Sequence, residues 1–470
     1  MKSGTSRLRL LAMAAAALSL SACVDDDQGF STTPTPANGA MFARYMALGN
    51  SITAGYQSGG INDSTQARSY VPLLAAKAGV TNFGVPSIAR PGCPVPFVAP
   101  LTAATGVAPT CARSATGAQV NFVQNVAVPG ARLLDLLRVP SGQLGQLNTL
   151  IVGPRTQVRA MKEGQPTFVS VWVGNNDALE ASLSGNLGPT ATRADSTLTP
   201  LATFQAQLTQ LVDSIKSTNP RGVMLVGVVD AVRAVPLIQP GAYFFVASQA
   251  TAGRFNGKLV NANCSPVNAL GQPNPLSRNM VSFQIVSDAN FGEINCDPNF
   301  YAVGDPRRGV YLLDTAEQAA VSARVGTLAN GTASGGGYNA AIRAAADANG
   351  WLYVDPNLIF NVFLAETIAP PTGTGTLRLY QRVRKCQHLS LATLTPAQLG
   401  EAVAKSCPNP SPVPSTGTTN VGAPGLFGSL FSFDGVHPST EAHQFLAEYF
   451  AGYINRKYGT TLASTITALP

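Results

Sequence analysis

Short apolar segments that alternate with helical patterns constrain the fold of this chain more than any other feature. Four of them are strand-sized, and each is followed at once by Gly or Asp; they cover residues 45–48, 167–173, 222–229 and 351–354. Helical patterns are expected near residues 70–78, 204–215 and 338–349, and after Ser439 or Thr440. This alternation predicts a parallel sheet with helices on both faces and with chemistry at the carboxyl ends of its strands.

Three long irregular inserts separate these elements, at about residues 82–120, 234–337 and 357–432. Because long loops in a compact domain usually serve a function, we expect the inserts to wall a functional site. Each insert contains two cysteines that are neighbours along the sequence. The sequence alone does not fix their pairing, but an oxidising compartment favours pairing within each insert. The expected disulfides are Cys93–Cys111, Cys264–Cys296 and Cys386–Cys407.

A metal site is the alternative use of these cysteines, and their spacing argues against it. The sequence contains no Cys-x-x-Cys pair, and its only histidines are His388, His437 and His443. Structural zinc sites are built from closely spaced Cys and His ligands. We therefore expect no bound metal.

The N-terminus has the form of a secretion signal. Three cations precede an apolar stretch over residues 10–22, which is too short to span a bilayer. The sequence Leu-Ser-Ala-Cys at residues 20–23 resembles the lipobox of bacterial lipoproteins, which implies removal of residues 1–22 and acylation of Cys23. An ordinary signal followed by a chance cysteine is the alternative. Val24, in place of an aspartate, resembles the pattern that sorts lipoproteins to the outer membrane.

The rest of the chain is expected to be a tether followed by one domain. Residues 23–40 are rich in Asp, Ser, Thr, Pro and Gly and offer little to bury, so we expect a flexible tether before a domain over residues 41–470. No later apolar run is long enough to span a membrane, so contact with the membrane is expected through the lipid anchor alone. Loss of the signal lowers the formal net charge from +7 to about +4, and the densest basic cluster, residues 382–385, is short. We therefore expect no nucleic-acid partner.

Ester hydrolysis through a covalent intermediate needs a hydroxyl nucleophile, a base, a group that orients the base and donors for the oxyanion. Ser51 directly follows a predicted strand and a glycine turn, where backbone N–H groups favour negative charge. His437 follows Asp434 by three residues, so one turn can present both side chains to the same place. Each of these motifs alone is more typical of a surface turn, and only their combination indicates catalysis.

Four sequence blocks carry a resemblance to the SGNH, or GDSL, hydrolase family. Residues 47–55, Ala-Leu-Gly-Asn-Ser-Ile-Thr-Ala-Gly, resemble the block with the nucleophile, and residues 125–131, Asn-Val-Ala-Val-Pro-Gly-Ala, resemble the second block. Residues 174–177, Gly-Asn-Asn-Asp, resemble the third, and residues 434–438, Asp-Gly-Val-His-Pro, resemble the last. The resemblance implies a three-layer α/β/α sandwich of flavodoxin-like type with a parallel sheet, and it covers the core but not the inserts.

The resemblance also implies a role for each residue of the site. Ser51 would be the nucleophile, His437 the general base and Asp434 the group that orients His437, with the oxyanion held by the N–H groups of Ser51 and Gly130 and by the amide of Asn176. No metal or organic cofactor is implied. The family acts on lipid esters, lysophospholipids, thioesters and acetylated sugars, so the fold alone does not name the substrate.

The resemblance does not decide four points: the effect of Asn50, the class of activity, the acyl-chain length and the oligomeric state. Asn50 replaces the aspartate that usually precedes the nucleophile in this family, and we expect it to tune the turn without abolishing activity. A carbohydrate O-deacetylase and a non-catalytic envelope binding protein are the alternatives to a carboxylesterase or lipase-like enzyme. The apolar residues scattered in the inserts favour a cleft for short to medium acyl chains over a large lipid-docking face. The sequence does not indicate an oligomeric state.

Overall fold

The computed structural model describes residues 37–114, 122–188, 197–250, 255–328, 332–361, 426–466 and 469–470. The predicted signal peptide, Cys23, the pair Cys386–Cys407 and most of the third insert lie outside these residues. Helix α3 (Ala37–Phe42) includes the last four residues of the segment predicted as a tether. None of the helices in the described ranges is both long and apolar enough to cross a membrane.

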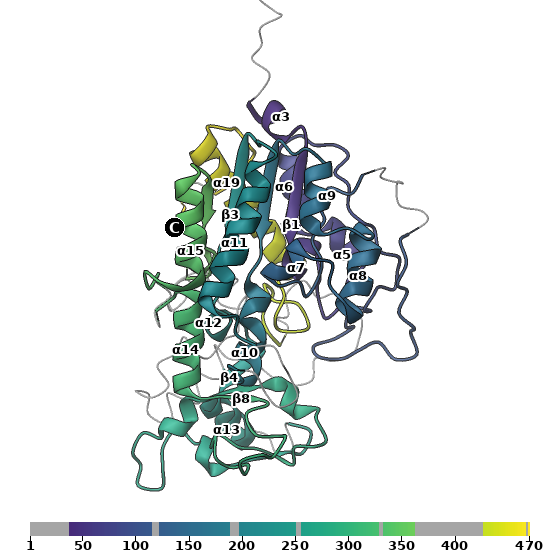
Figure 1. Ribbon diagram of the computed structural model, residues 1–470. Coiled ribbons are helices and arrows are strands. Elements are labelled where there is room, and N and C mark those ends of the chain that lie inside the picture. The colour runs from purple at the N-terminus through teal and green to yellow at the C-terminus, as the bar shows by residue number, and fades with distance from the viewer. Residues whose placement is uncertain are drawn as a thin grey trace, which may run out of the picture.

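A parallel sheet forms the centre of the molecule (Figure 1). Its strands lie in the order β1 (Tyr45–Gly49), β2 (Phe168–Trp172), β3 (Gly222–Val226) and β9 (Leu352–Val354). Asn125 forms a parallel bridge with Ala47 on the side of β1 that faces away from β2. The segment around Asn125, which comes between β1 and β2 in the sequence, therefore lies at the edge of the sheet beside β1. This order is that of flavodoxin-like sheets, in which ligands bind where the strand order reverses. The predicted fold class is confirmed.

Helices cover both faces of the sheet because side chains of its strands alternate between two apolar cores. Met46, Leu48 and Val169 face one core, whereas Tyr45 and Ala47 face the other. The first core is covered by α7 (Leu133–Leu137), α8 (Gly142–Val152), α9 (Gln157–Glu163), α11 (Leu201–Lys216) and α15 (Gly337–Ala348). The second is covered by α6 (Tyr70–Lys77) and α19 (Thr440–Tyr458). Figure 1 shows the resulting three layers.

The last helix, α19, begins where the sequence predicts a cap and carries the apolar spacing that the sequence shows. The Ser439 hydroxyl accepts a hydrogen bond from the N–H of Ala442 at 3.2 Å, and Gly459 ends the helix in a left-handed conformation. Its apolar face, which includes Leu446, Phe450 and Ile454, packs into the second core. This packing fixes the loop before α19 above the carboxyl end of the sheet.

The second insert forms a lobe below the sheet (Figure 1). The sequence had led us to expect an irregular insert, but the lobe contains short helices and strands. It carries a core of aromatic residues that includes Tyr243, Phe244 and Phe283. Its strands span only two or three residues each, which is too short to show the alternation that identifies a strand in sequence. Its elements are α12 (Ala231–Ala234), β4 (Ile238–Pro240), α13 (Gly241–Ala250), β5 (Leu259–Val260), η2 (Ala262–Cys264), η3 (Pro275–Arg278), β6 (Met280–Ser282), η4 (Phe283–Val286), β7 (Glu293–Ile294), β8 (Leu312–Leu313) and α14 (Thr315–Val325).

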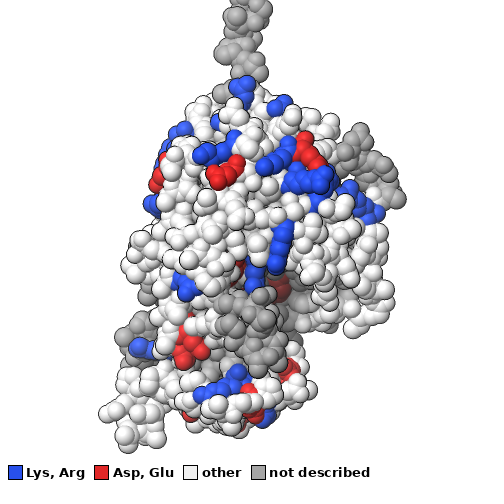
Figure 2. Space-filling model, in the orientation of Figure 1, with Lys and Arg blue, Asp and Glu red and all other residues white. Residues whose placement is uncertain are grey.

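Charged residues on the face shown in Figure 2 lie with both signs close together. Glu163 forms ion pairs with Arg155 and Arg159 near the top of the sheet, and Arg307 pairs with Asp305 in the lobe. Exposed pairs of this kind contribute little to stability.

Candidate active site

Ser51 lies in the first turn after β1, in a position that its neighbours define closely. A Cβ added to Gly49 would lie 2.4 Å from the carbonyl oxygen of Trp172, so only glycine permits this approach of the two strands. Asn50 then caps the short helix α4 (Ser51–Ala54) by accepting a hydrogen bond from the N–H of Ile52 at 3.2 Å. Ser51 therefore starts a helix at the carboxyl end of β1.

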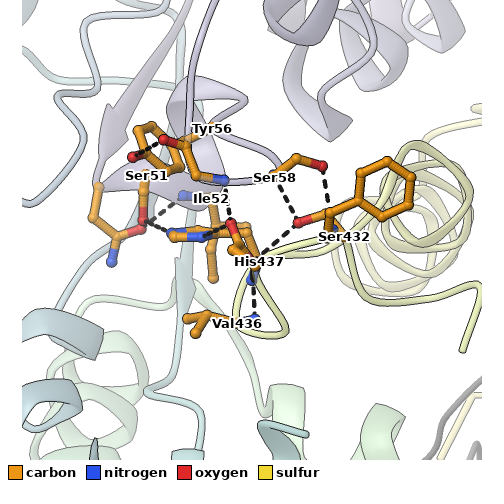
Figure 3. Close-up of polar contacts among 11 residues, drawn as sticks. Ser51, Ile52, Tyr56, Ser58, Ser432, Val436 and His437 are labelled. Carbon is orange, nitrogen blue, oxygen red and sulfur yellow. Dashed lines mark hydrogen bonds and ion pairs between the residues drawn. The ribbon is translucent and has the colours of Figure 1, made fainter. Parts of the chain in front are cut away.

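His437 connects Ser51 to Asp434 (Figure 3). Its Nε2 lies 2.9 Å from the Ser51 Oγ, and its Nδ1 lies 2.9 Å from the Asp434 Oδ2. A neutral imidazole that donates Nδ1–H to the carboxylate leaves Nε2 to accept the proton of the serine hydroxyl. Ser51 and His437 are 386 residues apart in the sequence. The structure thus brings together the three side chains predicted as nucleophile, base and orienting group.

Asp434 is buried but held as a carboxylate. Burial by itself raises its pKa, but the charge of His437 and the hydrogen bonds from His437 and Val436 outweigh burial and lower the pKa to about 2. The N–H groups of Val436 and His437 donate to Oδ1 at 2.9 and 2.8 Å. Asp434 therefore remains ionised at neutral pH and orients His437 without taking its proton.

Gly130 and Asn176, two of the three residues predicted as oxyanion donors, lie on neighbouring turns. Gly130 has φ +85°, and it lies in the turn that follows the segment paired with β1. Asn176 belongs to the 3₁₀ turn η1 (Asn175–Asp177) directly after β2, and its amide donates to the carbonyl of Ala131 at 2.9 Å. Asn176 lines the same cavity as Ser51 and His437, and it also lines a second cavity with Gly130. Their donation to an oxyanion remains a prediction.

The carboxylate of Asp177, at the end of the second turn, forms a hydrogen bond with the backbone just after the first. It accepts hydrogen bonds from the N–H of Leu133 at 3.0 Å and from the Thr199 hydroxyl at 2.8 Å. Burial raises the pKa of Asp177 to about 6, although the Leu133 and Thr199 hydrogen bonds act in the opposite direction. The sequence pattern places Asp177 in the third block but does not indicate this link, because Leu133 is 44 residues away.

An apolar cavity of about 110 Å³ opens beside Ser51 and His437. Its walls come from the ends of β2, β3 and β9, from the loop before α19, and from α19 itself. The rings of Phe360 and Phe431 lie edge to face, 6.3 Å apart, at this cavity. The other lining residues are Ile52, Trp172, Asn175, Asn176, Leu179, Val229, Ala231, Ala234, Val235, Pro356, Ile359, Leu430, Val436, Pro438, Ala442 and Leu446. A carbonyl that reaches Ser51 can therefore place an apolar substituent in this cavity.

Two further side chains lie near the triad, Tyr56, which the sequence did not indicate, and Asn50, which it did. The Tyr56 ring lies against the His437 imidazole, with ring centres 4.8 Å apart. Asn50 is fully buried, and its amide nitrogen has no hydrogen-bond partner among the described residues. The neutral amide keeps the capping oxygen of the usual aspartate without burying a charge.

The second histidine of the described residues lies apart from the triad. His443 is fully buried in α19, and its Nδ1 accepts a hydrogen bond from the N–H of Tyr70 at 3.2 Å. Burial, together with the nearby charge of His437, lowers its pKa to about 3, so the ring is neutral at physiological pH. His443 is therefore a buried side chain that packs against α6.

Two of the three expected disulfides are present in the described residues, Cys93–Cys111 and Cys264–Cys296. The third pair lies outside them. Within the described ranges, no group of three or more His, Cys, Asp or Glu side chains is placed to hold a metal ion.

Comparison with known families supports the chemistry of this geometry. The family described as GDSL-like lipase/acylhydrolase matches residues 45–263. This region resembles a GDSL-like hydrolase. The GDSL-like region contains Ser51, Gly130 and Asn176, whereas Asp434 and His437 lie beyond it and reach the site through the fold. A search of curated proteins finds none that matches the chain.

Proposed function

We propose that this chain is a serine esterase of the SGNH, or GDSL, family that cleaves carboxylic esters through an acyl-enzyme on Ser51. The observation that carries the proposal is the hydrogen-bonded series Ser51, His437 and Asp434 at the mouth of an apolar cavity. A hydroxyl within reach of a base, and a base held by a buried carboxylate, is the arrangement that covalent ester hydrolysis requires.

The reaction follows from these contacts. His437 Nε2 takes the proton of Ser51 as the serine oxygen bonds to the ester carbonyl carbon, and the negative charge collects on the carbonyl oxygen. The N–H groups of Ser51 and Gly130 and the amide of Asn176 stabilise that charge. The C–O bond to the alcohol then breaks, and His437 returns the proton to the departing oxygen. Water, activated by His437, hydrolyses the acyl-enzyme in the same two steps.

The proposed substrate class is an ester with a short to medium acyl chain. The cavity beside Ser51 is lined almost entirely by apolar side chains, which favours an acyl group larger than acetate. Phe360 and Phe431 close part of it, which opposes chains as long as palmitate. This lining distinguishes the proposal from a carbohydrate deacetylase, whose acyl group needs no such cavity.

The proposed location is the bacterial cell envelope, with Cys23 lipidated and the enzyme held to the outer membrane through residues 23–40. The lipobox-like sequence supports this part of the proposal. More than one acyl chain on Cys23 would give durable anchoring, since a single chain binds a membrane only marginally.

A fluorophosphonate probe tests the proposed nucleophile. Folded protein should be labelled at Ser51, and Ser51→Ala or His437→Ala should reduce kcat on p-nitrophenyl butyrate by roughly 10⁴-fold. Asp434→Asn should cost less, because Asp434 orients the base and does not transfer the proton. Ser287→Ala, at an exposed serine in the lobe, is the matched control and should retain full activity. If folded protein does not react with the probe, a non-catalytic binding protein becomes the better interpretation.

A further inference from the structure

The turn after α4 contacts two members of the triad, Asp434 and His437. Gly59 donates its N–H to the Asp434 Oδ2 at 2.6 Å, the same oxygen that contacts His437 Nδ1. The Tyr56 hydroxyl donates to the carbonyl of Gly59 at 2.5 Å, and its ring lies on the imidazole of His437. One turn therefore touches both the orienting carboxylate and the base, although it lies outside the four sequence blocks except at its start.

Ser58 and Ser432 join this turn to the loop that carries Asp434 (Figure 3). The N–H of Ser58 donates to the Ser432 Oγ at 2.8 Å, and the N–H of Phe433 donates to the Ser58 Oγ at 3.2 Å. The Ser432 hydroxyl donates in turn to the Asp434 Oδ1 at 3.1 Å. Ser58 has φ +54°, which is uncommon for a residue other than glycine. A residue other than glycine keeps this conformation only when its surroundings hold it there. Here the hydrogen bonds of Ser58 with Ser432 and Phe433 hold it.

The segment closed by the Cys93–Cys111 disulfide supports this junction from outside. The N–H of Phe97 donates to the carbonyl of Ser58 at 2.6 Å, and the Phe97 ring packs on Gly59 so closely that an added Cβ would lie 2.8 Å from it. Leu101 donates its N–H to the carbonyl of Phe433 at 2.9 Å. The same segment thus holds both loops that meet at Asp434.

We propose that residues 93–111 are a positioning element of the triad, which fixes Asp434 through Gly59 and through Ser432. This inference rests on the proposed function. No residue of the segment lines the cavity beside Ser51, so the segment acts on the orientation of the carboxylate and hence of the imidazole. Ser432 is accordingly a positioning residue. Its loss affects the chemical step and leaves binding of the acyl chain unchanged.

The first test compares the two disulfides of the described chain. Cys93→Ala/Cys111→Ala should lower kcat between tenfold and roughly 100-fold with KM within about twofold, as expected when a reacting group is displaced without loss of binding. Cys264→Ala/Cys296→Ala removes a disulfide from the lobe and is the matched control, for which kcat per labelled active site should stay unchanged. Equal kcat losses in the two folded double variants, or a change confined to KM, would overturn the proposal.

A second test does not depend on the folding of the cysteine variants. Ser432→Ala should slow fluorophosphonate labelling of Ser51 about tenfold in the wild-type background and by less than about twofold in an Asp434→Asn background. A purely structural role would cost the same in both. Equal losses in the two backgrounds, or none in either, would refute the positioning role. If Ser51 is not labelled in the unsubstituted protein, the proposed function itself fails, which is a separate result.

Discussion

Phe360 is expected to set the acyl-chain length that this enzyme prefers. The residue is 9 % exposed, lines the cavity beside Ser51 and packs edge to face on Phe431, in a small cluster with Leu430, Ala234 and Ala442. Phe360→Ala removes the six ring carbons from the cavity wall. The space that they leave can accept additional methylene groups of a longer acyl chain.

The size of the effect follows from the apolar lining. Each methylene buried contributes about 0.8 kcal/mol, or roughly fourfold in kcat/KM if it is bound equally in the transition state. For two esters that differ by two methylenes, Phe360→Ala should therefore raise kcat/KM for the longer ester relative to the shorter one by about 15-fold. The variant should also lose stability, by up to roughly 3–5 kcal/mol if the wall does not collapse.

The assay is kcat/KM on p-nitrophenyl esters from acetate to palmitate at constant detergent. The unsubstituted enzyme should peak at a short to medium chain, and Phe360→Ala should peak at least two methylenes later. Phe83→Ala removes the same ring from the second core, away from the cavity, and is the matched control with an unshifted profile. A profile that Phe360→Ala leaves unshifted, in protein that still reacts with fluorophosphonate, would refute this role. A peak at palmitate in the unsubstituted enzyme would indicate a true lipase, and activity on acetate alone a deacetylase.

Three further predictions concern the frame of the site and its anchor. Gly49→Ala should destabilise the protein by roughly 1–3 kcal/mol in urea unfolding, because the new Cβ meets a backbone oxygen, whereas Gly292→Ala, with open space around it, should not. Since the pKa of Asp177 is raised to about 6 in the folded state, its contribution to stability is present at low pH and is lost as pH rises from about 4 to 6. Across this range, the free energy of unfolding of the unsubstituted protein should therefore fall by up to roughly 3 kcal/mol relative to that of Asp177→Asn. A difference between the two proteins that does not change with pH would contradict the raised pKa of Asp177. Cys23→Ser should abolish acylation, and an N-terminal mass unchanged by this substitution would rule out the lipid anchor.

Several elements were predictable from the sequence because their information is local. The strands of the central sheet lie in mostly apolar segments that Gly or Asp follows, and β1, β2, β3 and β9 lie within one to three residues of the predicted limits. Helices α11 and α19 carry a regular apolar face. The short strands of the lobe could not be predicted in this way, because two or three residues show no period.

The sequence alone predicted the nucleophile within residues 47–51, and the base and the orienting carboxylate within residues 434–437. Their roles followed from residue type, spacing and family resemblance, none of which contains a distance between the two segments. Only the tertiary structure decided that the last helix packs into the second core, against α6 and β9, and that His437 Nε2 lies 2.9 Å from the Ser51 Oγ. The same holds for the contacts of Gly59 with Asp434 and of Ser58 with Ser432, and for the apolar cavity. Each of these contacts joins segments that are hundreds of residues apart. Burial of apolar surface brings such segments together, and because it is not directional, their arrangement depends on the packing of the whole chain.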